Sequence, residues 1–284
     1  IALVTGGSRG LGLQMAEGLG EMGAKIAITA RKKNELDEAI AHLSGMGIEA
    51  YPLVTDLQDP TVAEPTVLDV IKRWGKIDIL VNNAGIERHG SVEELTMEDF
   101  KAVMETNYFG VLRCIKSVLP GMRNNKTGCI INIASVAGKI ANTPLGAYSA
   151  SKFALESVSE ALAQEVKPFN IRVAIVEPGI IDTQMARDIS AGGESVYPQV
   201  NRFGGLFEAS PQTPTNVSLV ANKILEIADN ETWQLRHPVG PDALPFLQWR
   251  ASMTDEEWVD WNAATDDDWF NAVESSFGLN ARPV

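Results

Sequence analysis

The chain has 284 residues, of which 45% are apolar and 21% are charged, and its formal net charge is −13. This length suits one large α/β domain or two small ones. The negative charge argues against nucleic acid or an anionic membrane as a partner, because phosphates would be repelled. No apolar run approaches the ~18 residues of a membrane-spanning helix.

Short apolar runs alternate with longer helical patterns. We expect strands over residues 1–5, 25–29, 49–55, 77–83, 128–135, 171–179 and 233–239. We expect helices over residues 11–22, 33–46, 60–74, 96–123 in one piece or two, 147–167 and 214–229. This alternation predicts a single doubly wound parallel sheet of Rossmann type, with helices on both faces and ligands at the carboxyl ends of the strands.

The cysteines and histidines carry little functional signal. Cys114 and Cys129 form no CxxC motif, so we expect a reducing, cytoplasmic compartment. His42, His89 and His237 lie far apart in the sequence, and we therefore predict no metal site.

The segment TGGSRGLG, residues 5–12, lies between the first strand and the first helix. Glycines at positions 6, 10 and 12 permit a tight turn and a close approach of the backbone to phosphate. The helix N-terminus then offers N–H donors and the positive end of its dipole to a pyrophosphate. A glycine-rich turn can be only a turn, but after the first strand of a βαβ unit it indicates a dinucleotide site.

Basic residues follow the second strand, where an acidic partner of the adenosine ribose is usual. The segment ITARKK places Arg31, Lys32 and Lys33 there, and Arg9 lies inside the glycine loop. In an acidic protein, a 2′-phosphate explains such a cluster through charge-assisted hydrogen bonds. We therefore predict NADP(H) over NAD(H); the alternative is a solvated basic start of the second helix.

These features identify a resemblance to the short-chain dehydrogenase/reductase family over roughly residues 1–183, with a weaker likeness to about residue 240. The glycine spacing T-G-x-x-x-G-x-G matches the family, as do NNAG at 82–85 and the Tyr-x-x-x-Lys pair of YSASK at 148–152. Together, in this order, these motifs are specific.

Single residues extend the resemblance. Asp56 in TDL matches the family's residue near the adenine, and Asn107 matches its asparagine in the fourth helix. Ser135 ends the fifth strand thirteen positions before Tyr148, as in the family, and PGIIDT at 178–183 matches the segment near the nicotinamide amide.

The resemblance implies an NAD(P)-dependent enzyme that acts on CH–OH and C=O groups. Tyr148 would be the general acid in reduction and the base in oxidation. Lys152, on the same helix face, would lower the pKa of the phenol and bind the nicotinamide ribose. Ser135 would hold the substrate oxygen, and Asn107 would order a water chain from Lys152 to solvent. The implied cofactor-binding residues are Gly6, Ser8, Arg9, Gly10, Leu11, Gly12, Arg31, Lys32, Asp56, Leu57, Asn83, Ala84, Gly85, Tyr148, Lys152, Pro178, Gly179, Ile181 and Thr183.

The favoured function is that of an NADP(H)-preferring carbonyl reductase, or of a dehydrogenase that runs in reverse. A 3-oxoacyl-carrier-protein reductase shares the motifs, but acidic carrier proteins would be repelled by a charge of −13. An epimerase or dehydratase would space its glycines as G-x-x-G-x-x-G. A non-catalytic cofactor sensor commonly loses the tyrosine or the lysine, and both are present here.

Residues 1–240 should form the cofactor-binding and catalytic domain, with a substrate lid at 184–213. Apolar residues in the lid favour a hydrophobic or aromatic ketone or alcohol as the substrate. Arg88 and His89 are expected to be plain loop residues, with a place in the cleft as the alternative. The possible hinges of the lid are Gly192, Gly193, Gly204 and Gly205, and the apolar residues are Val196, Tyr197, Phe203, Leu206 and Phe207.

Residues 241–284 should form a C-terminal extension. Three prolines predict that residues 236–249 are extended or turning. Thr254 and Glu257 fit a helix capping box, and Trp258 and Trp261 should share one helix face. The aromatic residues could pack on this subunit, over the cleft or on a neighbouring subunit. We favour the neighbouring subunit, in a homodimer or homotetramer.

Overall fold

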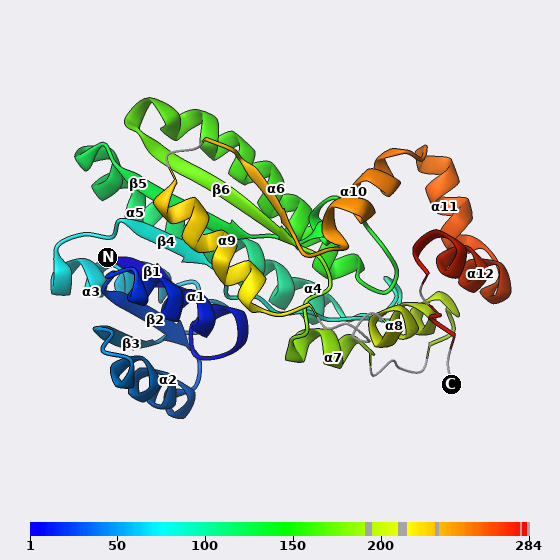
Figure 1. Cartoon of the computed structure of the whole chain (residues 1–284), viewed down its shortest axis with the longest axis horizontal. Coiled ribbons are helices and arrows are strands. Elements are labelled where there is room, and N and C mark those ends of the chain that lie inside the picture. Colours follow the sequence, from blue (N-terminus) through cyan, green and yellow to red (C-terminus); the bar gives the residue numbers. More distant parts are fainter. Residues whose placement is uncertain (191–194, 210–214, 231–232, 279, 283–284) are drawn as a thin grey trace.

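A computed structural model describes residues 1–190, 195–209, 215–230, 233–278 and 280–282. Its centre is a parallel sheet of seven strands in the order β3-β2-β1-β4-β5-β6-β7 (Figure 1). The predicted Rossmann-type α/β fold is therefore confirmed. The strands are β1 (Ala2–Val4), β2 (Ile26–Ala30), β3 (Ala50–Val54), β4 (Ile79–Asn82), β5 (Gly128–Ile133), β6 (Ile171–Pro178) and β7 (Arg236–Val239).

The central strands are buried on both faces, and this explains their continuous apolar runs. In β1, Ala2 and Val4 face one core cluster and Leu3 faces the other. In β5, Ile131 and Ile130 divide in the same way. Successive side chains of a strand point to opposite faces, so one strand contributes to two cores.

In the part of the chain that the structure describes, three helices supply side chains to the core on each face of the sheet. Helices α1 (Gly10–Glu21), α2 (Lys33–Gly45) and α9 (Ser218–Asp229) supply Met15, Leu36 and Ile224, among others, to the first core. The second core takes Val67 from α3 (Ala63–Trp74), Val118 from α5 (Val111–Asn125) and Leu155 from α6 (Gly146–Val166). Apart from α5, the predicted bounds of these helices differ from the observed ones by a few residues at most.

The helix expected over residues 96–123 is interrupted. It consists of α4 (Met97–Met104), a π-helical segment η1 (Glu105–Gly110) and α5. The π-helical segment carries Asn107, whose side chain is completely buried. Short π-helical segments often occur at functional sites, because they turn a side chain or carbonyl away from the regular helix.

The C-terminal extension is helical, with α10 (Ala243–Ala251), α11 (Asp255–Ala263) and α12 (Asp266–Phe277). Figure 1 shows these helices at one end of the molecule, beside α7 (Gln184–Ser190) and α8 (Gln199–Ala209). The prediction that residues 236–249 avoid a helix was wrong from Ala243 onward. Pro245 lies in the first turn of α10, where the missing N–H would have no helical partner in any case.

The rest of the extension follows the prediction. Thr254 and Glu257 form the capping box of α11, and the rings of Trp258 and Trp261 stack with their centroids 5.5 Å apart. These two rings pack on each other within this chain, and the contact of the extension with a neighbouring subunit stays a prediction. Whether the chain forms a dimer or tetramer stays a prediction.

The sequence predicted neither a membrane-spanning helix nor a metal site. Within the described ranges, no helix is both long and apolar enough to cross a membrane. The same ranges contain no group of three or more His, Cys, Asp or Glu side chains that could hold a metal ion.

Candidate active site

The order of the sheet reverses at β1, which lies between β2 and β4. Ligands of doubly wound sheets bind outside the carboxyl ends of the strands at such a point. A cavity of about 480 Å³ lies there, lined by the loops after β1 to β6 and by the C-terminal extension. All nineteen residues predicted to bind the cofactor line this cavity, and so does Ser135. Asn107 does not.

The loop after β1 depends on glycine at several of its positions. Gly6 and Gly10 have φ angles of +64° and +54°, which other residues rarely adopt. A Cβ atom on Gly12 would lie 2.1 Å from the carbonyl oxygen of Gly6. Arg9, at the start of α1, makes no side-chain cap, so the first N–H groups of that helix stay available. This geometry fits a dinucleotide pyrophosphate.

The loop after β4 is fastened to the loop after β1. The Asn83 side-chain amide donates to the carbonyl oxygens of Thr5, at 2.9 Å, and Gly6, at 3.1 Å. The Thr5 hydroxyl accepts from the backbone N–H groups of Asn83 and Ala84, both at 3.0 Å. Thr5, which is buried, was missed as a positioning residue because its partners are 78 and 79 positions away in the sequence.

The predicted basic cluster is smaller than the sequence suggested. Arg9, Arg31 and Lys32 line the cavity, but the Lys33 ammonium pairs with Asp37, 2.6 Å away on the next turn of α2. Glu35, which the sequence analysis missed, also lines the cavity. Its carboxylate lies 3.0 Å from the Lys32 ammonium and 4.0 Å from the Arg9 guanidinium, and the bond from Lys32 lowers its pKa.

A half-buried acid at the start of the extension supports the loop after β6. One carboxylate oxygen of Asp242 accepts a hydrogen bond from the Ile180 backbone N–H at 2.7 Å. A Cβ atom on Gly179 would lie 2.3 Å from the other oxygen, so this contact also requires a glycine. Asp242 was missed because it lies more than 60 positions beyond the motif that it supports.

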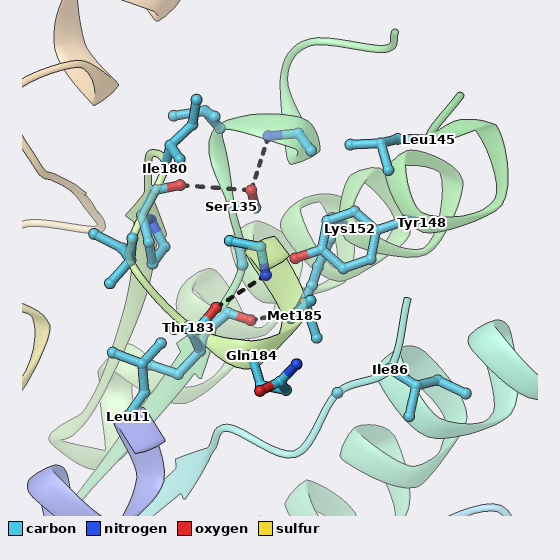
Figure 2. A pocket seen from close by; sticks show the side chains of 18 of the residues that line it. Leu11, Ile86, Ser135, Leu145, Tyr148, Lys152, Ile180, Thr183, Gln184 and Met185 are labelled. Atoms are coloured by element: carbon cyan, nitrogen blue, oxygen red, sulfur yellow. Dashed lines mark hydrogen bonds between the residues drawn. The ribbon is translucent and has the colours of Figure 1, made fainter. Parts of the chain in front are cut away.

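Three of the four predicted catalytic side chains reach the cavity, and they come from two parts of the chain. Ser135 follows β5, while Tyr148 and Lys152 come from the first two turns of α6. Figure 2 shows the Tyr148 hydroxyl directed into the space that Ser135, Thr183 and Met185 also surround. The Lys152 ammonium lies 5.5 Å from the centre of the Tyr148 ring and donates to the carbonyl oxygen of Ile133 at 2.7 Å.

The expected lowering of the phenol pKa is wrong for this structure. Burial raises the pKa of Tyr148 to about 12, the side-chain hydrogen bond with Ser135 opposes the rise, and the nearby Glu87 carboxylate adds to it. Withdrawal from water disfavours a phenolate more than the protein stabilises it here. Tyr148 therefore carries its proton at neutral pH.

The pKa of Lys152 changes in the opposite direction, also because of burial. Burial lowers its pKa to about 8, and the Glu156 carboxylate, one turn further along α6, partly offsets this change. Glu156 is itself buried, and its carboxylate lies 2.9 Å from the Arg236 guanidinium. Lys152 thus keeps its charge at neutral pH and begins to lose it just above.

Asn107 lies behind the cavity. Its side-chain oxygen accepts from the Ile86 N–H at 2.8 Å, and its amide donates to the Ile86 carbonyl at 2.9 Å and to the Ser151 hydroxyl at 3.0 Å. This side chain therefore fastens the loop after β4 to α6. Its predicted part in a water chain is not tested by these contacts.

Comparison with known proteins decides the family. The family model described as short chain dehydrogenase matches residues 1–193, about two thirds of the chain. The chain belongs to the short-chain dehydrogenase/reductase family. It is accordingly an NAD(P)-dependent oxidoreductase that acts on CH–OH or C=O groups.

Members of the short-chain dehydrogenase/reductase family resemble the chain over most of its length. The oxidoreductase BOA17 of Botryotinia fuckeliana is 32% identical over 93% of this chain and 98% of its own. The 3-oxoacyl-[acyl-carrier-protein] reductase of Escherichia coli is 35% identical over 81% of this chain and 90% of its own. A variant of actinorhodin polyketide ketoreductase, solved with NADPH, has a TM-score of 0.78 at 31% identity and covers 85% of this chain and 96% of its own.

The C-terminal extension lines part of the cavity, which is one of the three places that the sequence analysis left open for its aromatic side chains. Six aromatic side chains of the extension line it, and we call this set the aromatic wall: Phe246, Trp249, Trp258, Trp261, Trp269 and Phe277. The sequence signal was the density of tryptophan after residue 245, but the sequence does not show what these rings contact.

The remaining substrate predictions have mixed outcomes. Arg88 pairs with Asp99 at 3.3 Å and His89 with Glu87 at 3.4 Å, and neither lines the cavity, as expected of loop residues. In the predicted lid, the Tyr197 hydroxyl donates to Glu93, and Glu94 accepts from the Val196 N–H at 3.0 Å. Gly192, Gly193 and the side chains of Phe203, Leu206 and Phe207 lie outside the described residues.

Proposed function

We propose that this protein is an NADP(H)-preferring carbonyl reductase that interconverts a ketone and a secondary alcohol. The observation that carries the proposal is one continuous cavity whose lining includes the glycine loop, Ser135 and Tyr148. A hydride donor on the glycine loop and a carbonyl beside Tyr148 would therefore meet in one space, which is the main contribution of a binding site to such a transfer.

The chain's own residues fit the cofactor. The glycine loop and the start of α1 would hold the pyrophosphate, Asp56 and Leu57 the adenine, and Lys152 the nicotinamide ribose. Pro178, Gly179 and Thr183 would hold the nicotinamide amide. The bound cofactor supplies the hydride in reduction and accepts it in oxidation.

The proposed preference for NADP(H) rests on three basic side chains and one acidic side chain that line the cavity. Arg9, Arg31 and Lys32 surround the place expected for the adenosine ribose, and a 2′-phosphate would form charge-assisted bonds with them. Glu35 now pairs with two of these cations. A 2′-phosphate would compete with this carboxylate, so the preference should be moderate.

Proton transfer follows from the pKa values. In reduction, the carbonyl oxygen of the substrate would take the Tyr148 proton, which is present because burial raises that pKa to about 12. The Ser135 hydroxyl donates a hydrogen bond to the oxygen as charge develops on it. The Lys152 ammonium favours the phenolate that results, and the proton returns from solvent along the water chain predicted near Asn107.

Two other functions remain as alternatives. A 3-oxoacyl-carrier-protein reductase is favoured by the 35% identity to the Escherichia coli enzyme, but the net charge of −13 would repel an acidic carrier protein. A cofactor-sensing protein without turnover would have no use for the proton of Tyr148.

The test is NADPH oxidation with a panel of ketones by the unmodified protein and by Tyr148→Phe. Removal of the transferred proton should lower kcat roughly 10²–10⁴-fold, while the melting temperature and the NADPH dissociation constant stay the same. A Tyr148→Phe protein with more than about half of the original rate would show that the assignment is wrong.

A further inference from the structure

The aromatic wall and the catalytic pair share one cavity. The six rings come from α10, α11 and α12, more than 90 residues beyond Tyr148 in the sequence, yet they line the same space as Tyr148 and Ser135. Trp258 and Trp269 are buried, whereas Phe246, Trp249, Trp261 and Phe277 are half-buried. Those four rings therefore keep surface that a ligand in the cavity can contact.

The rings form a connected set with Trp249 at its centre. Its ring lies edge-on to Trp258 at 5.2 Å, to Trp261 at 4.8 Å and to Phe277 at 5.0 Å between centroids. Phe277 in turn lies edge-on to Phe246 at 5.1 Å. Edge-to-face contacts at these distances are the favoured geometry of aromatic pairs, so each ring restrains the next.

Several contacts fix the wall and its helices to the catalytic domain. The Trp258 indole N–H donates to the Ala141 carbonyl oxygen at 3.1 Å, in the segment that leads into α6. Arg202, which is only 5% exposed on α8, pairs with Asp266 at the start of α12. The wall thus keeps its position relative to the catalytic residues.

The wall offers few polar groups to a ligand. Among the described residues of the extension, Asn262 supplies the one polar side chain in the lining, and its amide donates to the Trp258 carbonyl at 2.9 Å. The guanidinium of Arg202, which also lines the cavity, is balanced by Asp266. The wall itself therefore favours an apolar surface over a polar one, while the polar side chains of Asn142, Thr143, Gln184 and Gln199 also line the same cavity.

We propose that the aromatic wall binds the body of the substrate, and that this body is a flat, apolar aromatic ring system attached to the ketone. The proposal rests on the function proposed above for the carbonyl end. A flat ring would add one more member to an existing set of edge-to-face pairs. A saturated ring of the same size would gain only from the burial of its surface.

The test compares benzylacetone with its ring-saturated analogue, in which a cyclohexyl group replaces the phenyl group. The two carbonyl groups have the same chemical surroundings, so a difference in kcat/KM reports on the ring alone. Several aromatic contacts should favour benzylacetone by about tenfold. The naphthyl homologue should be reduced with a still higher kcat/KM.

Variants of Trp261 locate the effect. Trp261→Leu should reduce the ratio of the two kcat/KM values by at least about threefold, whereas Trp261→Phe, which keeps a ring, should preserve most of it. Trp233→Leu is the matched control, because Trp233 is 43% exposed and lies outside the cavity lining. That control should keep both kcat/KM values.

Binding is measured separately from turnover. The intrinsic fluorescence of Tyr148→Phe, saturated with NADPH, should be quenched by benzylacetone at a concentration several-fold lower than by the saturated analogue. If the unmodified protein reduces no ketone of the panel, the proposed function fails, and this titration still decides the present inference. Equal kcat/KM and equal binding of the two ketones would overturn the inference and leave the reductase assignment intact. If Trp261→Leu does not fold, the unmodified protein and Trp261→Phe decide the question.

Discussion

The two ends of the cavity differ in what lines them: backbone at one end and aromatic side chains at the other. The cofactor end consists largely of backbone, with glycines at positions where a side chain would collide, and its contacts come from loops that follow consecutive strands. The other end, which we propose holds the substrate, is lined by six aromatic side chains from residues 246–277. A site made of backbone needs particular residue types at fixed spacing, whereas a wall of side chains can arise from many sequences.

The first prediction breaks the cofactor end alone. Gly12→Ala places a Cβ atom 2.1 Å from the Gly6 carbonyl oxygen, so the loop must move away from its phosphate-binding shape. Such overpacking costs about 1–3 kcal/mol, which corresponds to a roughly 10–100-fold weaker NADPH dissociation constant. Calorimetric titration with NADPH measures the change.

Gly121→Ala is the control for this experiment. Gly121 lies in α5, and a Cβ atom there would meet nothing within 4 Å. NADPH should bind to this variant as to the unmodified protein. If Gly12→Ala binds NADPH within about twofold of the unmodified protein, the glycine loop does not form the phosphate site.

The second prediction concerns the pH dependence of the reaction, which we attribute to Lys152. Because burial lowers the pKa of Lys152 to about 8, this group is charged below that pH and loses its charge above it. We expect kcat/KM for ketone reduction to be level near neutrality and to fall, by up to about tenfold per pH unit, above pH ~8. Tyr148, with a pKa of about 12, keeps its proton throughout this range.

Glu156 supplies the internal check on that pH profile. Its carboxylate raises the pKa of Lys152, so Glu156→Gln should move the fall in kcat/KM to a lower pH. A profile that stays in place in this variant would assign the titration to another group.

The third prediction concerns the charged side chains that are expected to surround the adenosine ribose. Arg31→Asp replaces a cation of the cluster with an anion and should weaken NADPH relative to NADH by about tenfold or more, the value of one charge-assisted bond. Glu35→Gln removes the carboxylate that pairs with Lys32 and Arg9, and it should change the ratio in the opposite direction. Equal dissociation constants for the two cofactors in the unmodified protein would refute the preference itself.

The smallest expected effect concerns the attachment of the aromatic wall. Trp258→Phe keeps an aromatic ring but removes the N–H that donates to Ala141. The free energy of unfolding should fall by about 1 kcal/mol, as measured by urea denaturation. Trp233→Phe, at a ring that is 43% exposed, should change it by less than about 0.5 kcal/mol. Equal changes in the two variants would mean that the bond to Ala141 does not stabilise the fold.

The parts of the molecule that depend on local sequence patterns could be predicted, and the parts that depend on distant contacts could not. The strands, the main helices and the glycine loop could be predicted because apolar periodicity and glycine spacing are local properties. Thr5, Glu35 and Asp242 could not, since their importance depends on partners that only the folded chain brings near. The helix α10 was missed because Pro245 breaks a helix interior but is tolerated in a first turn.

The pKa of Tyr148 also could not be predicted from the sequence. The spacing of Tyr148 and Lys152 correctly indicates a shared helix face, and from it we expected a lowered phenol pKa. The direction depends on burial, which neither residue reveals in the sequence, and in the structure burial dominates. The aromatic residues of the extension are a parallel case, since their number was evident and their location was not.

The most direct test of the central claim is to follow the hydride itself. Benzylacetone is incubated with NADPH that carries deuterium on one or the other face of its nicotinamide ring, and the alcohol is analysed by mass spectrometry. We predict one deuterium at the carbinol carbon from only one of the two labelled cofactors, because a single cavity fixes both reactants, and no labelled alcohol with Tyr148→Phe on the same time scale. Oxidation of NADPH without deuterium in the alcohol, or label from both faces, would contradict the account.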